Sequence, residues 1–253
     1  MSLPELPSFY RLVARERVAS TSDEAKDLAA AGAPAGTLVW ARAQSAGRGR
    51  QGRGWISPAG NFYASLLLRP AVPIAIAAQL GFVAALAVSD ACLALAPEAA
   101  IALKWPNDVL LDGRKLAGIL LESQASAGGA LDWLVIGIGI NLATYPTDAD
   151  YRATALSATG ADAAPETMLE TVAAALLDWY GRWQDGAGFA AIRSAWLARA
   201  AGLGQAICVR LPGSTIEGRF AGLDTDGALL LDSAAGRRRI AAGEVFPAAA
   251  AAA

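Results

Sequence analysis

The stretch from Ile101 to Glu122, IALKWPNDVLLDGRKLAGILLE, contains three candidate β-strands joined by tight turns. The candidate strands are Ile101 to Trp105, Val109 to Leu111 and Arg114 to Glu122. Asp112-Gly113, between the last two, is a strong signal for a two-residue hairpin turn. Such a turn pairs Leu110 with Lys115 and places Asp108 diagonally across from Lys115 on the same sheet face. The stretch therefore predicts antiparallel strands that carry an acidic and a basic group side by side.

Candidate elements on both sides of this stretch extend the sheet and cover it. Thr21-Ser22-Asp23-Glu24 matches a capping box with Thr21 as the N-cap, which predicts a helix ending near Gly32. The other candidates are strands at 37–42, 61–69 and 131–142, a buried helix at 74–96, and helices at 165–184 and 189–201. Because turns join most of the strands, the predicted fold class is α+β, with a mixed or antiparallel sheet covered by helices.

The sequence after Gly202-Leu203-Gly204 changes to short strands separated by turn signals. These candidate strands are 206–211, 215–223, 228–232 and 237–241. Such a pattern predicts a small β-barrel that packs on the larger domain. The predicted organisation is a main domain at 1–202, a barrel domain at 203–247 and an alanine tail at 248–253. Within the main domain, loops are expected at 123–130 and 143–165, and the second is a candidate lid over a site.

Net charge and residue usage exclude several classes of function. The 253-residue chain has a net charge of -2, so it lacks the overall positive charge of proteins that bind nucleic acid without regard to sequence. It contains no histidine, which excludes Ser-His and Cys-His triads and removes the usual zinc ligand. Its two cysteines, Cys92 and Cys208, offer no disulfide framework and are expected in the core. Any catalysis must therefore depend on positioning and electrostatics.

Neither a membrane span nor a signal peptide is expected. The longest apolar run, Leu80 to Val88, is far shorter than the roughly 20 residues that a spanning helix needs. Residues 1–17 lack the basic start and apolar stretch of a signal peptide. These features predict a cytoplasmic protein.

The segment from Gly47 to Trp55, GRGRQGRGW, combines four glycines with three arginines. Glycine raises the conformational entropy that ordering must overcome, so we expect a mobile loop that no helix or strand holds and that a bound anion orders. Guanidinium groups bind phosphate or carboxylate bidentately, and the N–H groups of a glycine-rich loop can surround an anion. The segment thus predicts an anion site, and a solvated or RNA-binding arginine-glycine loop is the alternative.

Three further motifs have both a structural and a functional interpretation. Lys104 to Asp108, KWPND, gathers a cation, an amide and a carboxylate, although an ordinary hairpin with a surface ion pair has the same residues. Ile136 to Asn141, IGIGIN, leaves one strand face bare at its two glycines for another backbone or a ligand, and core packing is the alternative. Ser20 and Thr21 have hydroxyls that cap a helix and can still contact a ligand.

Taken together, the arginine-glycine loop, KWPND, KLAGIL at 115–120 and IGIGIN resemble biotin protein ligase in their order and spacing. The resemblance extends from about Ser20 to the C-terminal strands. It implies a catalytic domain like that of biotin and lipoate ligases, followed by an SH3-like β-barrel. The family's long form begins with a DNA-binding winged helix. With fewer than twenty residues before Ser20, the resemblance implies the short, catalysis-only form.

The resemblance also implies a two-step reaction. Biotin and MgATP form biotinyl-5'-adenylate and pyrophosphate, and a lysine of a biotin carboxyl carrier protein or domain then attacks the mixed anhydride. ATP and Mg2+ are the implied cofactors. No DNA or membrane partner is expected. The chain is expected to act as a monomer or homodimer. Lipoate or octanoate transfer by a related fold is the enzymatic alternative, and an RNA-binding module is the non-enzymatic one.

Residue roles carried over from the family fall on the motifs quoted above. The implied catalytic residues are Lys115, Asp108 and Arg50. The implied biotin-binding residues are Ser20, Thr21, Ser22, Gln44, Arg48, Gly49, Arg50 and Lys115. The implied ATP-binding residues are Arg50, Arg53, Trp55, Lys104, Asn107 and Asn141, and the implied magnesium ligands are Asn107 and Asp108. Asp108 has an alternative role in orienting the acceptor lysine, and Ser22 and Gly54 depart from the residues that the family commonly has there.

Overall fold

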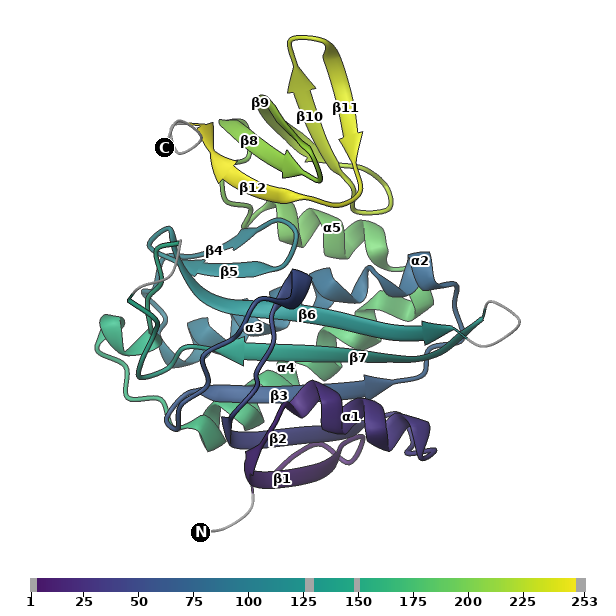
Figure 1. The fold of residues 1–253 in the computed structure, drawn as a ribbon, viewed down its shortest axis with the longest axis vertical. Helices are drawn as coiled ribbons and strands as arrows, with labels where there is room; N and C mark the ends of the chain where they lie inside the picture. The colour runs from purple at the N-terminus through teal and green to yellow at the C-terminus, as the bar shows by residue number, and fades with distance from the viewer. Residues whose placement is uncertain (1–3, 126–129, 148–150, 249–253) are drawn as a thin grey trace.

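The computed structural model describes residues 4–125, 130–147 and 151–248, which form a seven-stranded sheet with helices on both faces and a separate five-stranded sheet (Figure 1). The large sheet has the strand order β1-β2-β3-β7-β6-β5-β4. β1 and β2 are parallel, and the other neighbouring strands are antiparallel. The strands are β1 (Arg11–Val18), β2 (Thr37–Gln44), β3 (Phe62–Leu68), β4 (Ile101–Lys104), β5 (Asp108–Leu111), β6 (Arg114–Ala125) and β7 (Leu131–Ile140). The predicted α+β class with a mixed sheet is confirmed.

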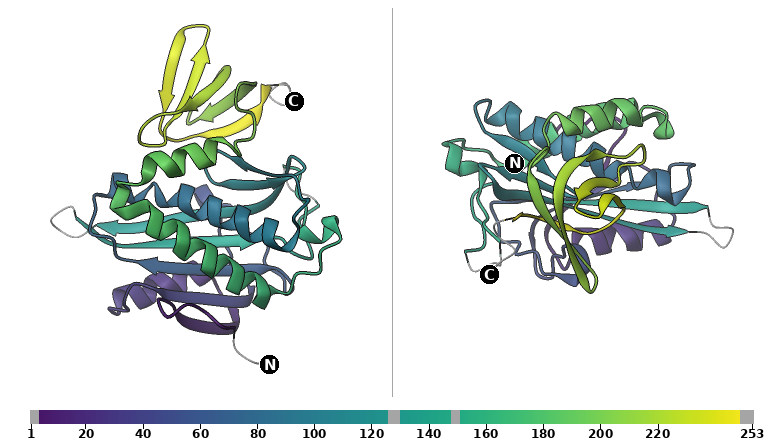
Figure 2. Two further views of the ribbon diagram at one scale, coloured as in Figure 1. Left: turned by 180° about the vertical axis from the view of Figure 1, so that it is seen from behind. Right: turned by 90° about the horizontal axis from the view of Figure 1, so that it is seen from above.

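Helices cover both faces of the large sheet because its central strands are apolar on both sides (Figure 2). Successive side chains of a strand point to opposite faces. On β2, Val39 packs with α1 (Thr21–Ala30), whereas Leu38 belongs to the core that contains α3 (Leu80–Leu95) and α4 (Pro165–Trp183). The sheet is thus enclosed between α1 and the α3–α4 layer, which leaves its β4–β5 end for the C-terminal unit.

The predicted helix at 74–96 is two helices, α2 (Ile74–Ala77) and α3. By length and composition the stretch Ile74–Leu95 is long and apolar enough to cross a membrane, so the apolar segment is longer than the predicted run Leu80 to Val88. Most of this stretch is buried inside the protein, where α3 contacts α4, α5 (Phe189–Leu197) and the sheet. α3 is therefore the central helix of the core.

Local details of three predicted elements differ from the structure. The N-cap of α1 is Ser20 and not Thr21, since Ser20 Oγ accepts a hydrogen bond from the Asp23 N–H at 3.4 Å. The predicted loop at 123–130 begins later, because β6 continues to Ala125, and residues 126–129 lie outside the described residues. Within the predicted loop at 143–165, Leu156–Thr159 forms a 3-10 turn, and residues 148–150 lie outside the described residues.

The hairpin between β5 and β6 forms as predicted. The Asp112-Gly113 turn has φ angles of 50° and 72°, the left-handed conformation that a two-residue hairpin needs. Leu110 pairs with Lys115, as the turn predicts. A register shift between Val109 and Leu110 then leaves Leu116 as an extra residue on β6, which the sequence analysis misses.

The C-terminal unit is an antiparallel sheet with the strand order β11-β10-β9-β8-β12. Its strands are β8 (Ala206–Leu211), β9 (Ser214–Leu223), β10 (Leu229–Ser233), β11 (Gly236–Ile240) and β12 (Glu244–Pro247). One apolar core continues from the large sheet into this unit, and Trp105 Nε1 donates to the Gly227 carbonyl across the boundary at 3.1 Å. The unit therefore packs on the main domain, as expected.

Two edge strands, β1 and β12, are missing from the predictions. Four of the eight residues of β1 are charged, which obscures the apolar alternation of a strand. β12 is only four residues long and ends in proline. Short, charged or proline-containing strands are typical of sheet edges, where one side of the strand faces water.

Asn61 fixes the chain where it leaves β7. Its Oδ1 accepts hydrogen bonds from the N–H groups of Leu142, Ala143 and Thr144 at 2.9 to 3.1 Å, and its Nδ2 donates to the Thr144 carbonyl at 2.8 Å. Asn61→Ala should lower the free energy of unfolding by on the order of 3 kcal/mol, because it leaves the buried N–H of Leu142 and the part-buried N–H groups of Ala143 and Thr144 without this acceptor. Urea denaturation measures this loss. Asn61→Asp retains the acceptor and should cost less; equal losses would contradict this account.

Candidate active site

A cavity of about 790 Å³ lies between the large sheet, the arginine-glycine loop and the C-terminal strands β8 and β12. All of the candidate site residues line it, although they come from five separate segments of the chain. They are Ser20, Thr21, Ser22, Gln44, Arg48, Gly49, Arg50, Arg53, Trp55, Lys104, Asn107, Asp108, Lys115 and Asn141. The structure thus brings the candidate site residues together in one place.

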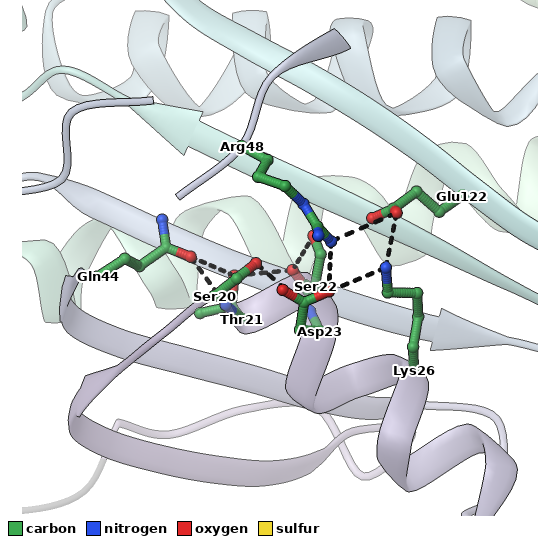
Figure 3. A network of polar contacts seen from close by, with 9 residues as sticks. Ser20, Thr21, Ser22, Asp23, Lys26, Gln44, Arg48 and Glu122 are labelled. Carbon is green, nitrogen blue, oxygen red and sulfur yellow. Dashed lines mark hydrogen bonds and ion pairs between the residues drawn. The ribbon is translucent and has the colours of Figure 1, made fainter. Parts of the chain in front are cut away.

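Hydroxyl and amide groups form one end of the cavity, at the N-terminus of α1 (Figure 3). Gln44 Oε1 accepts from the N–H and the Oγ1 of Thr21 at 2.8 and 3.1 Å. The hydroxyl of Ser65, on β3, contacts Thr21 Oγ1 at 2.8 Å and Ser22 Oγ at 3.0 Å. Gln44 Nε2 donates to Ser57 Oγ at 2.9 Å, which fixes the orientation of the amide. This end is therefore a preorganised, buried polar surface.

Positive side chains dominate the other end of the cavity. Lys115 Nζ lies 2.7 Å from Asp108 Oδ1, and Lys104 Nζ lies 3.2 Å from Asp108 Oδ2, so one carboxylate holds two ammonium groups. The contact between Asp108 and Lys115 is the one that the hairpin predicts. Arg50 Nη1 donates to Asn107 Oδ1 at 3.2 Å and to the Gly243 carbonyl at 3.4 Å, both of which are uncharged acceptors.

Burial of Arg50 lowers the pKa of its guanidinium, although the negative charges of Asp108 and Glu244 act in the opposite direction. A partly desolvated cation gains most from an anion that contacts it directly. Lys104, Lys115 and Arg50 gather near the carboxylate of Asp108, so positive charge is in excess at this end. The arrangement favours a ligand that carries carboxylate or phosphate groups.

The amide groups of Asn107 and Asn141 hold the walls of the site. Asn107 Nδ2 donates to the Ile119 carbonyl at 2.8 Å, and Asn141 Nδ2 donates to the Thr154 carbonyl at 3.0 Å. Thr154 in turn donates its N–H to the Lys115 carbonyl, and the Lys115 N–H donates to the backbone carbonyl of Arg152. The described part of the candidate lid therefore fixes the backbone of Lys115. Tyr151 adds its ring 5.0 Å from Lys115 Nζ.

The glycines of the IGIGIN strand face the cavity. A Cβ atom at Gly139 would lie 2.6 Å from the Trp55 ring, and one at Gly137 would lie 2.6 Å from Ser22 Oγ. The Trp55 ring also covers Gly118 and lies 5.4 Å from Lys115 Nζ. Its Nε1 is buried and has no hydrogen-bond partner among the described residues. The bare strand face is thus the floor of the cavity, and a side chain of the loop lies on it.

Gly139→Ala should displace the Trp55 ring without unfolding the protein, because alanine is compatible with a strand and the clash involves only a side chain. We expect weaker binding of any ligand of the cavity, about tenfold in Kd, which corresponds to about 1.4 kcal/mol. Isothermal titration measures it. Gly81→Ala, where a Cβ meets only Leu121 at ordinary contact distance, is the control. Unchanged affinity in Gly139→Ala would mean that the position of Trp55 is unimportant.

The arginine-glycine loop is anchored at each arginine. Arg48 forms an ion pair with Asp23 on α1, Arg50 reaches the β12 side of the cavity, and Arg53 forms an ion pair with Glu244 on β12. The expectation that no helix or strand holds the loop is wrong in detail. Arg50–Gly52 forms a 3-10 turn, and Arg48 and Gly54 form an isolated β-bridge.

Comparison with known proteins agrees with this geometry. The family model for the biotin/lipoate A/B protein ligases matches residues 14–141, and the model for the biotin protein ligase C-terminal domain matches residues 202–246. The biotin--[acetyl-CoA-carboxylase] ligase of Paracoccus denitrificans is 48% identical over 91% of this chain and 98% of its own length. The chain belongs to the biotin protein ligase family.

Two further relatives support this membership. The bifunctional ligase/repressor BirA of Bacillus spizizenii is 36% identical to this chain. The match covers 92% of this chain and 73% of BirA. The structure of the Aquifex aeolicus biotin protein ligase with biotin and ATP superposes with a TM-score of 0.79. It is 30% identical over 93% of this chain and 97% of its own.

The cavity also contains residues that the sequence analysis misses. Tyr151 from the candidate lid and Arg210, Glu244 and Phe246 from the C-terminal sheet line it, whereas Ser65 and Ser57 lie behind its polar end, in contact with Thr21 and Gln44. The Phe246 ring lies between two cations, 5.7 Å from Lys104 Nζ and 4.6 Å from the Arg210 guanidinium. None of the C-terminal residues belongs to a recognisable motif, so only the packing of the two sheets reveals them.

Proposed function

We propose that this chain is an ATP-dependent ligase that activates biotin as biotinyl-5'-AMP and transfers the biotinyl group to a lysine of a biotin carboxyl carrier domain. The observation that carries the proposal is one cavity, in a member of this family, with a hydroxyl-amide end and a cationic end joined by an aromatic side chain. The relatives are named for biotin ligation, and the Aquifex aeolicus structure contains biotin and ATP.

The chemistry of biotin matches the two ends of the cavity. Its ureido ring has N–H donors and a carbonyl acceptor, which suit the hydroxyls of Thr21 and Ser22 and the amide of Gln44. Its alkyl chain suits the Trp55 ring on the glycine floor. Its carboxylate then reaches Lys115. Ser20, Arg48 and Gly49 also line the cavity and are the further proposed biotin contacts.

In the first step, a carboxylate oxygen of biotin bonds to the α-phosphorus of ATP, and the bond from that phosphorus to pyrophosphate breaks. The biotin carboxylate is ionised at neutral pH, so no side-chain base is required. Lys115 and Arg50 offset the negative charge that gathers as the two anions meet. Asp108 holds the Lys115 ammonium in place by their contact at 2.7 Å. Arg53, Trp55, Lys104, Asn107 and Asn141 are the proposed nucleotide contacts.

In the second step, the ε-amine of the carrier lysine bonds to the acyl carbon of biotinyl-AMP. The bond from that carbon to the phosphate oxygen breaks, AMP leaves, and the amine proton is released to water. Asp108 is the acidic group beside Lys115 and Lys104, and we propose that it also orients the incoming amine. The closed loop excludes water from the anhydride until the acceptor arrives.

Asn107 and Asp108 do not fit a resident magnesium site. Both oxygens of Asp108 lie at ion-pair distance from ammonium groups, which compete with a divalent cation for the carboxylate, and Asn107 Oδ1 accepts from Arg50. Among residues 4–125, 130–147 and 151–248 no cluster of three acidic or cysteine side chains could hold a metal ion. We therefore assign no step to a protein-bound metal. Magnesium enters this proposal only with the phosphates of the nucleotide substrate.

Several wider predictions are part of the same proposal. The carrier domain is the protein partner, the protein acts in the cytoplasm without DNA, and it works as a monomer or homodimer. The domain bounds at 1–202 and 203–247 are likewise proposed, with the two family-model matches as their support.

The deciding experiment is incubation of the purified protein with labelled biotin, MgATP and a carrier domain. We expect biotin-dependent release of pyrophosphate and label on one carrier lysine. Lipoate replaces biotin in a parallel reaction, and retention of RNA at moderate salt is measured separately. Turnover with lipoate alone, or RNA retention without biotin-dependent turnover, would overturn the proposal in favour of one of the two alternatives.

A further inference from the structure

Four charged side chains meet beside the polar end of the cavity (Figure 3). Arg48, the first arginine of the loop, forms an ion pair with Asp23 and lies 3.6 Å from Glu122 Oε1. Lys26 Nζ lies 2.9 Å from Asp23 Oδ1 and 2.7 Å from Glu122 Oε1. The two acids and two bases form a closed ring that joins the loop, α1 and β6. We name these four residues the charge ring.

The charge ring is more than a chance surface ion pair. The side chains of Lys26 and Glu122 are only 25% and 26% exposed, and Glu122 Oε2 is buried without a hydrogen-bond partner among the described residues. Burial alone would raise the pKa of Asp23, but hydrogen bonds from Lys26 and Arg48 and their charges lower it overall. Each carboxylate thus contacts two cations. A cooperative set of this kind restrains the Arg48 side chain more than an isolated exposed ion pair would.

The position of the ring determines what it controls. Asp23 directly follows Ser22 on the first turn of α1, where Ser20, Thr21 and Ser22 line the cavity. Arg48 lies between Gly47 and Gly49 at the start of the loop. At Gly47 a Cβ would come within 2.6 Å of Ser57 Oγ, so the loop backbone packs closely on the group that orients Gln44. A displacement of Arg48 therefore moves the loop backbone away from the polar end.

We propose that Asp23, Lys26 and Glu122 are positioning residues that hold Arg48, and with it the backbone at 47–49, over the polar end of the cavity. They contact no reacting atom. Their effect is on retention of the ligand, which under the proposed function is biotin, and not on the chemical step. The other end of the loop is held separately, by Arg53 and Glu244.

The test compares Asp23→Asn and Glu122→Gln with the wild type and with a control, Asp178→Asn. The control breaks an exposed ion pair with Arg182 on α4, far from the loop in the sequence. The first measurement is the rate of tryptic cleavage after Arg50 and Arg53 in the ligand-free protein, read by mass spectrometry. We expect cleavage about tenfold faster in both ring variants, an opening that corresponds to about 1.4 kcal/mol. The control should match the wild type.

The second measurement is biotin-dependent pyrophosphate release. Both ring variants should raise the KM for biotin about tenfold and change kcat less than about twofold, and Asp23→Glu should restore much of the affinity. Cleavage and KM equal to those of Asp178→Asn would refute the positioning role. A fall in kcat at unchanged KM would refute it as well. If the wild type does not turn over biotin, the proposed function fails, but the cleavage rates still decide whether the ring holds the loop.

Discussion

Replacing Lys115 with alanine is expected to stop the first step almost completely. Its ammonium is the cation that Asp108 holds at 2.7 Å, and the backbone of Lys115 is fixed by Arg152 and Thr154. A preorganised donor of this kind stabilises charge that develops in the transition state, and its removal typically lowers kcat by about 10²- to 10³-fold. Biotin-dependent pyrophosphate release measures the effect.

The neighbouring cation on the same hairpin provides the control for Lys115. Arg114 is exposed and does not line the cavity, so Arg114→Ala removes one positive charge without touching the site. It should retain near-normal turnover. Lys115→Arg should restore little activity, because the planar guanidinium does not have the compact shape of the ammonium. Normal pyrophosphate release by Lys115→Ala would overturn the role assigned to this residue.

Replacing Arg50 with glycine is expected to release biotinyl-AMP into solution. Arg50 joins the loop to Asn107 on one side and to the Gly243 carbonyl on the other, so its loss opens the cavity between the two sheets. An open site admits water and lets the reactive anhydride diffuse away. We expect the amount of biotin label on lysines of a bystander protein to increase about tenfold or more. A tenfold increase corresponds to a loss of about 1.4 kcal/mol in the free energy of loop closure. Mass spectrometry of added albumin measures it.

Gln51→Gly is the matched control for Arg50→Gly. Gln51 is the next residue of the loop, is exposed and has a φ of 57°, so glycine fits its backbone without strain. This variant adds the same glycine flexibility but keeps the guanidinium. It should label only the carrier. If both variants leak equally, loop flexibility and not the Arg50 contacts controls retention; if neither leaks, the loop does not seal the site.

The parts of the fold that depend on neighbours in the chain are predictable from the sequence. The Asp112-Gly113 turn sets the pairing of Leu110 with Lys115, because a two-residue turn permits one register. The contact between Lys115 and Asp108 follows, although the bulge at Leu116 does not. The candidate site residues belong to short motifs, and the structure brings them together in one cavity, while the role of each stays a prediction.

Features that depend on packing between distant segments are not predictable in this way. Arg53 pairs with Glu244, which lies on the other sheet, and no local pattern marks either residue for the other. Ser20 and Thr21 satisfy the same capping pattern, so only the hydrogen bond to Asp23 identifies the cap. The Trp55 ring covers the strand face that the glycines leave bare. The sequence of the strand does not predict this, because Trp55 belongs to a separate loop.

The wall that β12 adds to the cavity has a consequence for biosynthesis. β12 follows every other described element in chain order, so the ribosome delivers Glu244 and the Gly243 carbonyl after the large sheet. Because domains generally fold in the order in which they emerge, a nascent chain holds Lys115 and Asp108 in place before the C-terminal partners of Arg50 and Arg53, the Gly243 carbonyl and Glu244, exist. Translation thus delays the sealing of the reaction chamber, and prematurely terminated chains would have an unsealed one.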